Sequence, residues 1–367
     1  MDMMQYRTVF RMAAAAAVAL VGCRPAETQG SQFHPRDPAS KTANRTHSGT
    51  AENMKPTYSA SLYDITPLPP EQVKNLAAKL NPEVYRITQK ADTEAPFCGT
   101  LLDNKKDGIY VCVVCGLPLF SSEHKFRSGT GWPSFHREFD PQHVARRKDK
   151  SLGMDRNEIV CARCQAHLGH VFDDGPPPTR QRHCLNSASL RFYDEGTALP
   201  PESRPVETET AYFAAGCFWG IEHYFQKGQG VLDAVSGYMQ GRVPKATYKQ
   251  VCRGDTGHAE TVKVVFDPQR ITYRRLLEVF FAMHDPTQRN RQGPDVGTQY
   301  RSGIWCASEE QRRAAEAFIA ELREQKRFGS RPIVTQVEKA ETFWPAEEYH
   351  QDYIVQTGRS CHVKNPW

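Results

Sequence analysis

Four of the eleven cysteines stand in two Cys-x-x-Cys pairs, and this spacing indicates a metal site. Cys112 and Cys115 form the first pair, and Cys161 and Cys164 form the second, further along the chain. Four thiolates in this arrangement are typical of tetrahedral zinc in a closed structural site, with no position left for water or substrate. We therefore predict one structural zinc ion per chain. Two disulfides are the alternative, because an exported protein meets an oxidising compartment.

Cys217 stands where a short apolar strand gives way to a helix. Residues 212–215 read as the strand, and Ile221 and Phe225 follow at helical spacing. At a helix start, the exposed amide groups and the helix dipole favour the thiolate form of a cysteine. The position therefore favours a reactive thiol. A small, buried, apolar cysteine is the alternative that position alone leaves open.

Three segments around the Cys-x-x-Cys pairs resemble the type B methionine sulfoxide reductases. They are residues 128–135 (SGTGWPSF), 167–175 (HLGHVFDDG) and 182–189 (RHCLNSAS). The resemblance implies that Cys184 is the nucleophile and that Trp132 covers the methyl group of the substrate. It also implies that the site is lined by His167, His170, Arg182 and Asn186.

The chemistry of a sulfoxide agrees with this set of residues. A thiolate attacks the sulfur, and the oxygen leaves only if a nearby group protonates it, so a cysteine is needed beside imidazoles and a cation. We expect His167 and His170 to supply that proton. Without the surrounding motifs, a His-x-x-His pair is more often structural or a metal site.

Two segments further along the chain resemble the type A methionine sulfoxide reductases. They are residues 216–220 (GCFWG) and 254–260 (GDTGHAE). The resemblance implies the following set: Cys217 as nucleophile, Phe218 and Trp219 as walls of the methyl pocket, Glu260 as the acid, and Tyr248, Asp295 and Tyr300 as its polar partners. The alternating run after Glu260 predicts a strand, so we expect the Glu260 carboxyl group to lie near the start of this strand and to be partly desolvated. A surface glutamate is the alternative.

Each turnover leaves a cysteine sulfenic acid, which a second thiol converts into a disulfide for an outside dithiol to reduce. Many type B relatives place that second cysteine where this chain has Thr130, so we predict that the remaining Cys98, in a turn-like segment, resolves Cys184. Direct attack by the reductant is the alternative. Cys361, on the polar C-terminal tail, is predicted to resolve Cys217. The expected reductant is a thioredoxin-like protein.

Composition predicts two folded domains. The 367 residues leave room for two domains and extensions. No apolar run approaches the roughly 20 residues of a spanning helix, which excludes a polytopic membrane protein. The basic residues form no run with interleaved aromatics, so nucleic-acid binding is not expected. The predicted boundaries are a signal peptide at 1–22, a flexible tether at 23–64, a type B domain at 65–195, a linker at 196–206 and a type A domain at 207–367.

The first domain is expected to be mostly β and the second α+β. The resemblances imply antiparallel sheets around the zinc in the first and a ferredoxin-like core in the second. Periodicity predicts helices at 272–283 and from Ser308, and strands at 231–238, 303–307 and 333–337. Cys252 and Cys306 fall in or beside strands and are predicted to be packing residues.

The N-terminus predicts export. Arg7 and Arg11 precede the apolar residues 12–21, which are too few to span a bilayer but fit a signal-peptide core. Residues 20–23 (LVGC) resemble the lipobox of bacterial lipoproteins, which implies that Cys23 is lipidated. The expected location is therefore the periplasm or cell exterior, with only a lipid anchor in the membrane. If this segment is not a signal, the chain is cytoplasmic.

Together these features predict one exported chain that repairs oxidised proteins. The type B domain would reduce the R epimer of methionine sulfoxide, and the type A domain the S epimer. The alternative is a zinc-organised, lipid-anchored peptide-binding module, which explains only the Cys-x-x-Cys pairs. Zinc deamination is disfavoured because no His-x-Glu accompanies a Pro-Cys-x-x-Cys.

Overall fold

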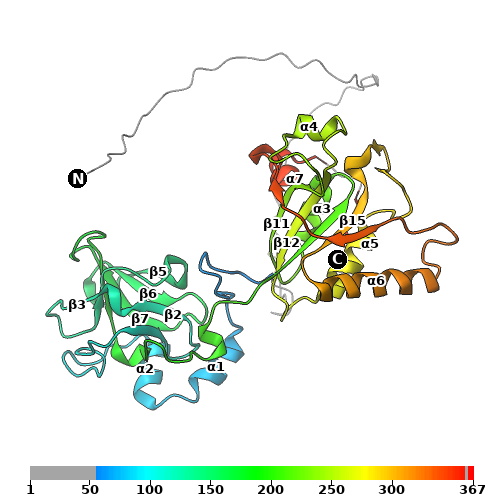
Figure 1. Cartoon of the computed structure of the whole chain (residues 1–367). Helices are drawn as coiled ribbons and strands as arrows, with labels where there is room; N and C mark the ends of the chain where they lie inside the picture. The colour runs from blue at the N-terminus through cyan, green and yellow to red at the C-terminus, as the bar shows by residue number, and fades with distance from the viewer. Residues whose placement is uncertain (1–54, 360–362) are drawn as a thin grey trace, which may run out of the picture. The chain divides into compact units, whose positions relative to one another are not determined.

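The computed structural model describes residues 55–359 and 363–367 (Figure 1). The predicted signal peptide, the lipidation of Cys23 and most of the tether fall on residues 1–54, and Cys361 falls on residues 360–362. These predictions therefore lie outside the described residues. Within the described ranges, no helix is long and apolar enough to cross a membrane.

The end of the predicted tether differs from the expectation. Tyr58 and Asp64 form an isolated β-bridge. Tyr63 is only 6% exposed, and its ring lies 5.7 Å from that of Phe139. Ala60 N–H also donates to Gln142 Oε1 at 2.7 Å, and Ser61 Oγ donates to Asp140 Oδ2 at 2.5 Å. Residues 55–64 therefore pack as part of the N-terminal half, by which we mean residues 55–206.

The N-terminal half is built on two antiparallel sheets and two short helices. The larger sheet has the order β3-β4-β8-β7-β6-β5, with β3 (Lys125–Phe126), β4 (Ser134–Phe135), β5 (Val144–Asp149), β6 (Arg156–Cys161), β7 (His167–Phe172) and β8 (Arg182–Leu185). The smaller has the order β2-β1-β9, with β1 (Gly108–Cys112), β2 (Pro118–Ser121) and β9 (Leu190–Asp194). The helices are α1 (Pro70–Ala77) and α2 (Pro82–Lys90).

Aromatic packing between the sheets forms the core of this half. The ring of Phe135 lies 4.9 Å from Tyr110 and 4.8 Å from Phe120, and all three side chains are fully buried. Because side chains alternate along a strand, β8 sends His183 into this core and leaves Cys184 half-buried on the other face. The core thus fixes the strand that carries the predicted nucleophile.

The C-terminal half, from residue 207 onward, has a mixed sheet of order β16-β15-β10-β12-β11-β17. Its strands are β10 (Glu209–Ala215), β11 (Val231–Met239), β12 (Ala259–Phe266), β15 (Ser302–Cys306), β16 (Gln336–Lys339) and β17 (Trp344–Pro345), and only β15 and β16 pair in parallel. A separate hairpin joins β13 (Arg291–Gln292) to β14 (Asp295–Val296). The helices are α3 (Phe218–Phe225), α4 (Tyr248–Cys252), α5 (Tyr273–Met283), α6 (Glu309–Glu324) and α7 (Tyr353–Thr357).

Stacked rings attach two helices to the centre of this sheet. Phe213 on β10 is fully buried, with its ring 5.0 Å from Phe225 of α3 and 5.1 Å from Phe280 of α5. The sheet therefore holds α3, the helix that follows Cys217, in a fixed position against β10.

Most predicted elements of the C-terminal half are confirmed. Helix α5 matches the range predicted from Thr272 to Met283, and Ser308 caps α6 by accepting the backbone N–H of Gln311, as the sequence predicted. Thr272 also caps its helix, by accepting the backbone N–H of Arg275. The strand predicted at 333–337 begins later, at Gln336, because this short edge strand has little apolar alternation to mark it. Cys306 is 3% exposed in β15, whereas Cys252 lies exposed at the end of helix α4 and not in a strand, so its packing role was wrongly predicted.

Candidate active sites and metal centre

Three paired strands build the first candidate site around Cys184. Strand β8 lies between β4 and β7, so Cys184 is directly opposite Ser134 on one side and His170 on the other. The three motif segments therefore meet at one thiol. The cleft at this point, about 110 Å³ in volume, is lined by Thr93, Trp132, Arg156, Gly169, His170, Phe172, Cys184, Leu185 and Asn186.

Glu94, which the sequence analysis missed, ties two walls of this cleft together. Its backbone carbonyl accepts the indole N–H of Trp132 at 3.1 Å, and its backbone N–H donates to Asn186 Oδ1 at 3.0 Å. Its carboxylate accepts the backbone N–H groups of Ser187 and Ala188 at 2.6 and 3.0 Å. Trp132 and Asn186 are thus held in place by one residue far away in sequence, which no local pattern marks.

Burial and two polar neighbours have opposite effects on the pKa of Cys184. Burial raises the pKa of the Cys184 thiol, while Thr130 and Arg182 act in the opposite direction. Thr130 Oγ1 lies 3.9 Å from the sulfur. Arg182 is held by two hydrogen bonds to Asp174, at 2.8 and 2.9 Å, and its guanidinium lies 4.4 Å from the centre of the Phe172 ring. Arg182 is therefore a fixed cation that can stabilise the thiolate form of Cys184.

Both predicted histidines, on β7, are hydrogen-bonded to carboxylates: that of Glu158 on the adjacent strand β6 and that of Asp149 on β5, one strand further away. His167 Nδ1 lies 2.7 Å from Glu158 Oε1, and His170 Nε2 lies 2.8 Å from Asp149 Oδ2. Because a carboxylate only accepts hydrogen bonds, these ring nitrogens carry the protons. His167 Nε2 is buried with no partner among the described residues. Burial lowers the pKa of His170, which favours its neutral form.

The carboxylates that fix these tautomers were not predicted. Asp149 also accepts a hydrogen bond from Arg156 at 2.7 Å, and Glu158 is the direct cross-strand neighbour of His170. Both are therefore placed by strand pairing, which the sequence motifs do not show.

Cys98 is exposed in a loop that packs against the Trp132 segment. The preceding Phe97 donates its backbone N–H to the carbonyl of Gly131 at 2.8 Å, and Cys98 N–H donates to Ala95 O at 3.4 Å. The predicted loop is confirmed, and the thiol is accessible. Its redox role stays a prediction.

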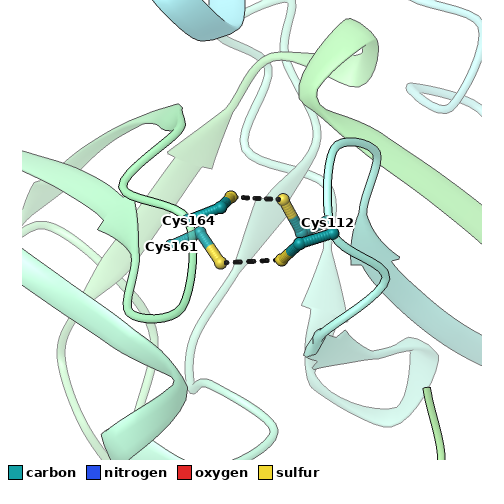
Figure 2. A group of neighbouring side chains, drawn as sticks. Cys112, Cys161 and Cys164 are labelled. Carbon is teal, nitrogen blue, oxygen red and sulfur yellow. Dashed lines mark hydrogen bonds between the residues drawn. The ribbon is translucent and has the colours of Figure 1, made fainter. Parts of the chain in front are cut away.

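The four paired cysteines converge in one buried cluster. Figure 2 shows the two Cys-x-x-Cys turns facing each other, and the four sulfur atoms all lie within 4.8 Å of one another. The distances Cys112 Sγ–Cys164 Sγ and Cys115 Sγ–Cys161 Sγ are both 3.5 Å, well beyond the roughly 2.05 Å of a disulfide bond. The alternative of two disulfides is therefore absent from this structure.

The two turns that carry the cluster have the same backbone form. Gly116 N–H donates to Cys112 O, and Gln165 N–H donates to Cys161 O, each at 2.9 Å. Gly116 and Gln165 both have positive φ, of 75° and 61°. Four soft, desolvated sulfur donors from two matching turns suit a tetrahedral ion such as zinc.

The second candidate site lies at the start of helix α3. Cys217 is the N-cap residue of this helix, and the next residue, Phe218, donates its backbone N–H to Glu260 Oε2 at 3.0 Å. Glu260 is 2% exposed on β12, between β10 and β11. Burial raises its pKa to about 8; the Phe218 N–H offsets part of this shift, and the charge of Asp295 adds to it. The predicted buried acid is thus beside the predicted nucleophile.

Aromatic side chains surround this thiol, and two of them were not predicted. Trp219 donates its indole N–H to His350 Nδ1 at 3.0 Å and stacks on Tyr353 with ring centres 3.8 Å apart. The ring of Phe218 lies 5.3 Å from His350, which is 2% exposed. His350 and Tyr353 come from the C-terminal segment, more than a hundred residues after Trp219, so no local spacing could have shown the contact.

The polar residues predicted for this site gather around Glu260. Burial raises the pKa of Tyr248 and of Tyr300, and the charge of Glu260 adds to both effects, which places the two hydroxyl groups near its carboxyl group. Cys252 also lies here, beside the Tyr248 hydroxyl. This second thiol near the site was missed because its helix was read as a strand.

A cleft of about 330 Å³ joins the thiol to the C-terminal segment. Its lining includes Cys217, Trp219, Asp295, Arg359 and Val363. Arg359 and Val363 flank Cys361 in sequence, two positions on either side. The described residues nearest to the predicted resolving cysteine therefore border the same cleft as the nucleophile.

Comparison with known proteins accounts for both halves. The SelR domain family matches residues 80–194, and the peptide methionine sulfoxide reductase family matches residues 209–366. The methionine sulfoxide reductase MsrA of Acidobacterium capsulatum is 54% identical over 154 residues, covering 42% of this chain and 98% of that protein. MsrB of Xylella fastidiosa strain 9a5c is 55% identical over 140 residues, covering 38% of this chain and 90% of that protein.

A solved structure also resembles the chain. The reduced form of Mxr1 from Saccharomyces cerevisiae is 37% identical, with a TM-score of 0.41, and the match covers 44% of this chain and 92% of that one. The two sequence relatives are each matched over nearly their whole length, by different halves of this chain. The chain therefore belongs to the peptide methionine sulfoxide reductases, with a type B domain followed by a type A domain.

Proposed function

We propose that Cys184 reduces the R epimer of methionine sulfoxide in oxidised proteins and that Cys217 reduces the S epimer. The family membership makes the chain a reductase of both epimers. The assignment of Cys217 rests chiefly on the contact between Phe218 N–H and Glu260, which holds a protonated acid beside this thiol. The type B half supplies its own thiol, aromatic wall and proton carriers.

The C-terminal site performs the reaction with a carboxylic acid. The Cys217 thiolate attacks the sulfoxide sulfur while Glu260 gives its proton to the oxygen. The oxygen passes to Cys217 as a sulfenic acid, methionine is released, and the proton that the Cys217 thiol gave up restores the acid form of Glu260. Phe218 and Trp219 enclose the methyl group, and Tyr248 and Tyr300 hold the oxygen. A buried acid suits this step, because it keeps its proton at neutral pH and has it available as charge develops on the oxygen.

The N-terminal site delivers the proton through imidazole. Arg182 stabilises the Cys184 thiolate, and the thiol proton moves to a histidine whose other nitrogen is already bound to a carboxylate. The imidazolium then returns this proton to the sulfoxide oxygen. Trp132, fixed by Glu94, covers the methyl group. No net proton is consumed in forming the Cys184 sulfenic acid.

Substitution of each nucleophile should separate the two activities. Cys184→Ser is expected to abolish reduction of the R epimer alone, and Cys217→Ser that of the S epimer alone, because each thiol stands in its own cleft. The measurement is turnover of each epimer of a methionine sulfoxide peptide with dithiothreitol. Loss of both activities from one substitution would refute independent sites. If the unaltered chain reduces neither epimer, the peptide-binding alternative replaces this function.

Activity toward the S epimer should depend on the proton of Glu260. The acid form is populated below about pH 8 and lost above it, so kcat/KM is expected to fall as the pH rises through this value. Glu260→Gln should lose about 10²-fold or more in rate and also lose this pH limb. R-epimer turnover in the same variant and Glu338→Gln, an exposed carboxylate on β16, serve as controls. An unchanged pH profile in Glu260→Gln would exclude Glu260 as the acid.

We also propose that Cys98 and Cys361 resolve the two sulfenic acids and that a thioredoxin-like protein reduces the resulting disulfides. Support for Cys98 comes from its exposure and from the packing of its loop on Gly131. Support for Cys361 comes from the neighbours Arg359 and Val363, which line the cleft of Cys217. Formation of each disulfide requires the two Cα atoms of the pair to lie within about 7 Å of each other.

Peptide mapping after one equivalent of substrate tests the resolving steps. Without reductant, the R epimer should yield a Cys98–Cys184 disulfide and the S epimer a Cys217–Cys361 disulfide. Cys98→Ser and Cys361→Ser should keep the first turnover and slow thioredoxin-supported cycling, whereas Cys306→Ser, a buried thiol, should change neither. A persistent Cys184 sulfenic acid beside a free Cys98 would favour direct attack by the reductant.

The buried cluster is proposed to bind one structural zinc ion. Cys112, Cys115, Cys161 and Cys164 would be its ligands, which leaves no open position for catalysis. Elemental analysis should find one zinc per chain, and Cys112→Ser should lose it and destabilise the type B half, because metal binding contributes directly to folding. Cys98→Ser, at an exposed thiol, should keep the metal. Two disulfides and no zinc by mass spectrometry would contradict this.

We propose, finally, that the chain is exported and anchored by a lipid on Cys23, facing the periplasm or cell exterior. The signal-like residues 12–21 and the LVGC motif support this. Membrane fractionation of the unaltered chain and of Cys23→Ser distinguishes this location from the cytoplasm.

A further inference from the structure

We propose that the groove beside Trp132 in the type B half binds the polypeptide that flanks the oxidised methionine, and that it favours acidic residues there. This rests on the proposed function of Cys184. The groove has a volume of about 480 Å³, whereas the cleft at Cys184 holds only about 110 Å³. The cleft is thus large enough for the end of one side chain, and the neighbouring chain must lie elsewhere.

The groove and the reactive cleft share a wall. Trp132 lines both, and the groove continues along Ser128, Gly129 and Gly131. Ser128 Oγ lies 2.9 Å from Thr130 Oγ1, which in turn lies 3.9 Å from the Cys184 sulfur. A peptide whose sulfoxide reaches Cys184 therefore has the groove as a continuous path across Trp132.

The floor of the groove is held in place before any peptide binds. Lys125 Nζ donates to the backbone carbonyls of Leu102 and Asn104, each at 2.8 Å. The side-chain amide of Asn104 donates to the hydroxyl of buried Tyr110 at 3.1 Å. Such a preformed surface loses little conformational entropy when it binds a ligand.

The charge of the groove selects the kind of peptide. Its charged lining consists of Asp103, Lys105, Lys106, Asp107, Lys125 and Arg127. Lys106 pairs with Asp194 at 2.9 Å, and Lys125 is occupied by the two carbonyls. Asp103 lies close enough to Lys125 for its charge to act on that ammonium group. Lys105, Arg127 and Asp107 are exposed and have no ion pair among the described residues. Two free cations therefore face one free carboxylate, and this net positive charge favours carboxylates of a substrate.

Phe97 at the rim adds an apolar contact. Its side chain is 68% exposed, and its backbone has φ of 64°, an unusual conformation for a bulky residue. The hydrogen bond from its N–H to Gly131 O maintains this conformation. Strain of this kind collects at functional sites, and here it presents a phenyl ring at the edge of the groove.

The test compares R-sulfoxide peptides that carry aspartate, alanine or lysine on either side of the sulfoxide, with dithiothreitol as reductant. Exposed ion pairs are weak, so two of them predict about a threefold to tenfold higher kcat/KM for the acidic peptides over the lysine peptides. This preference should shrink as salt is added. Lys105→Glu with Arg127→Glu should reverse it and leave turnover of N-acetyl-methionine R-sulfoxide unchanged. The matched control reverses Lys79 and Arg191, exposed cations outside the groove.

Three other results would each contradict the proposed peptide subsite. Equal kcat/KM for acidic and lysine peptides with the unaltered chain would overturn the subsite and leave Cys184 as the R-epimer nucleophile. An effect of the double reversal seen only when thioredoxin replaces dithiothreitol would assign the groove to the reductant and also overturn it. If no R-sulfoxide is reduced, the proposed function fails together with the subsite.

Discussion

Exclusion of water from one carboxyl group is the constraint on which the C-terminal site depends. Glu260 lies on β12, in the interior of the sheet, and its pKa is raised to about 8 by burial. A carboxyl group that is buried without a cation stays protonated, because its charged form would lose its hydration. The Phe218 N–H then fixes the group beside the start of α3. Strand β12, helix α3 and the Cys217 thiol are thus held together, and a shift in any of them would change the position or the pKa of the Glu260 carboxyl group.

In the proposed mechanism, the N-terminal half meets the same need for a proton through imidazole. Cys184 is the cross-strand neighbour of His170, and two imidazoles are bound to carboxylates: His167 to Glu158 and His170 to Asp149. These carboxylates settle which ring nitrogen carries hydrogen, and they favour the imidazolium as it forms. A neutral imidazole that receives the thiol proton can return it to the oxygen. Under this mechanism the two halves share a reaction but use different groups to supply the proton.

Local sequence patterns were enough to predict the cysteine cluster, most regular elements and the placement of Glu260 beside Cys217. Helix α5 was predictable because an apolar stripe follows a capping threonine, and the Cys-x-x-Cys turns were predictable because their spacing is local. Glu94 and His350 were not, since each meets its partners across a long stretch of chain. Hydrophobic periodicity shows which face of an element is buried but not which element lies opposite. The residues that support both sites could be found only from knowledge of which elements pack against each other.

Burial also separates the clustered thiols from the thiols that are proposed to react. Under the proposed cycle, disulfides form and break in each turnover, so the proposed zinc ligands must stay out of the exchange, and exchange requires access by a thiolate. The four clustered cysteines are at most 6% exposed, whereas Cys184 and Cys217 are half-buried and Cys98 is exposed. The two Cys-x-x-Cys turns keep their sulfurs within the core of the type B half, away from the cleft. Access, set by the fold, thus separates the four clustered cysteines from the thiols proposed to react, because the cysteine side chain itself is the same at every position.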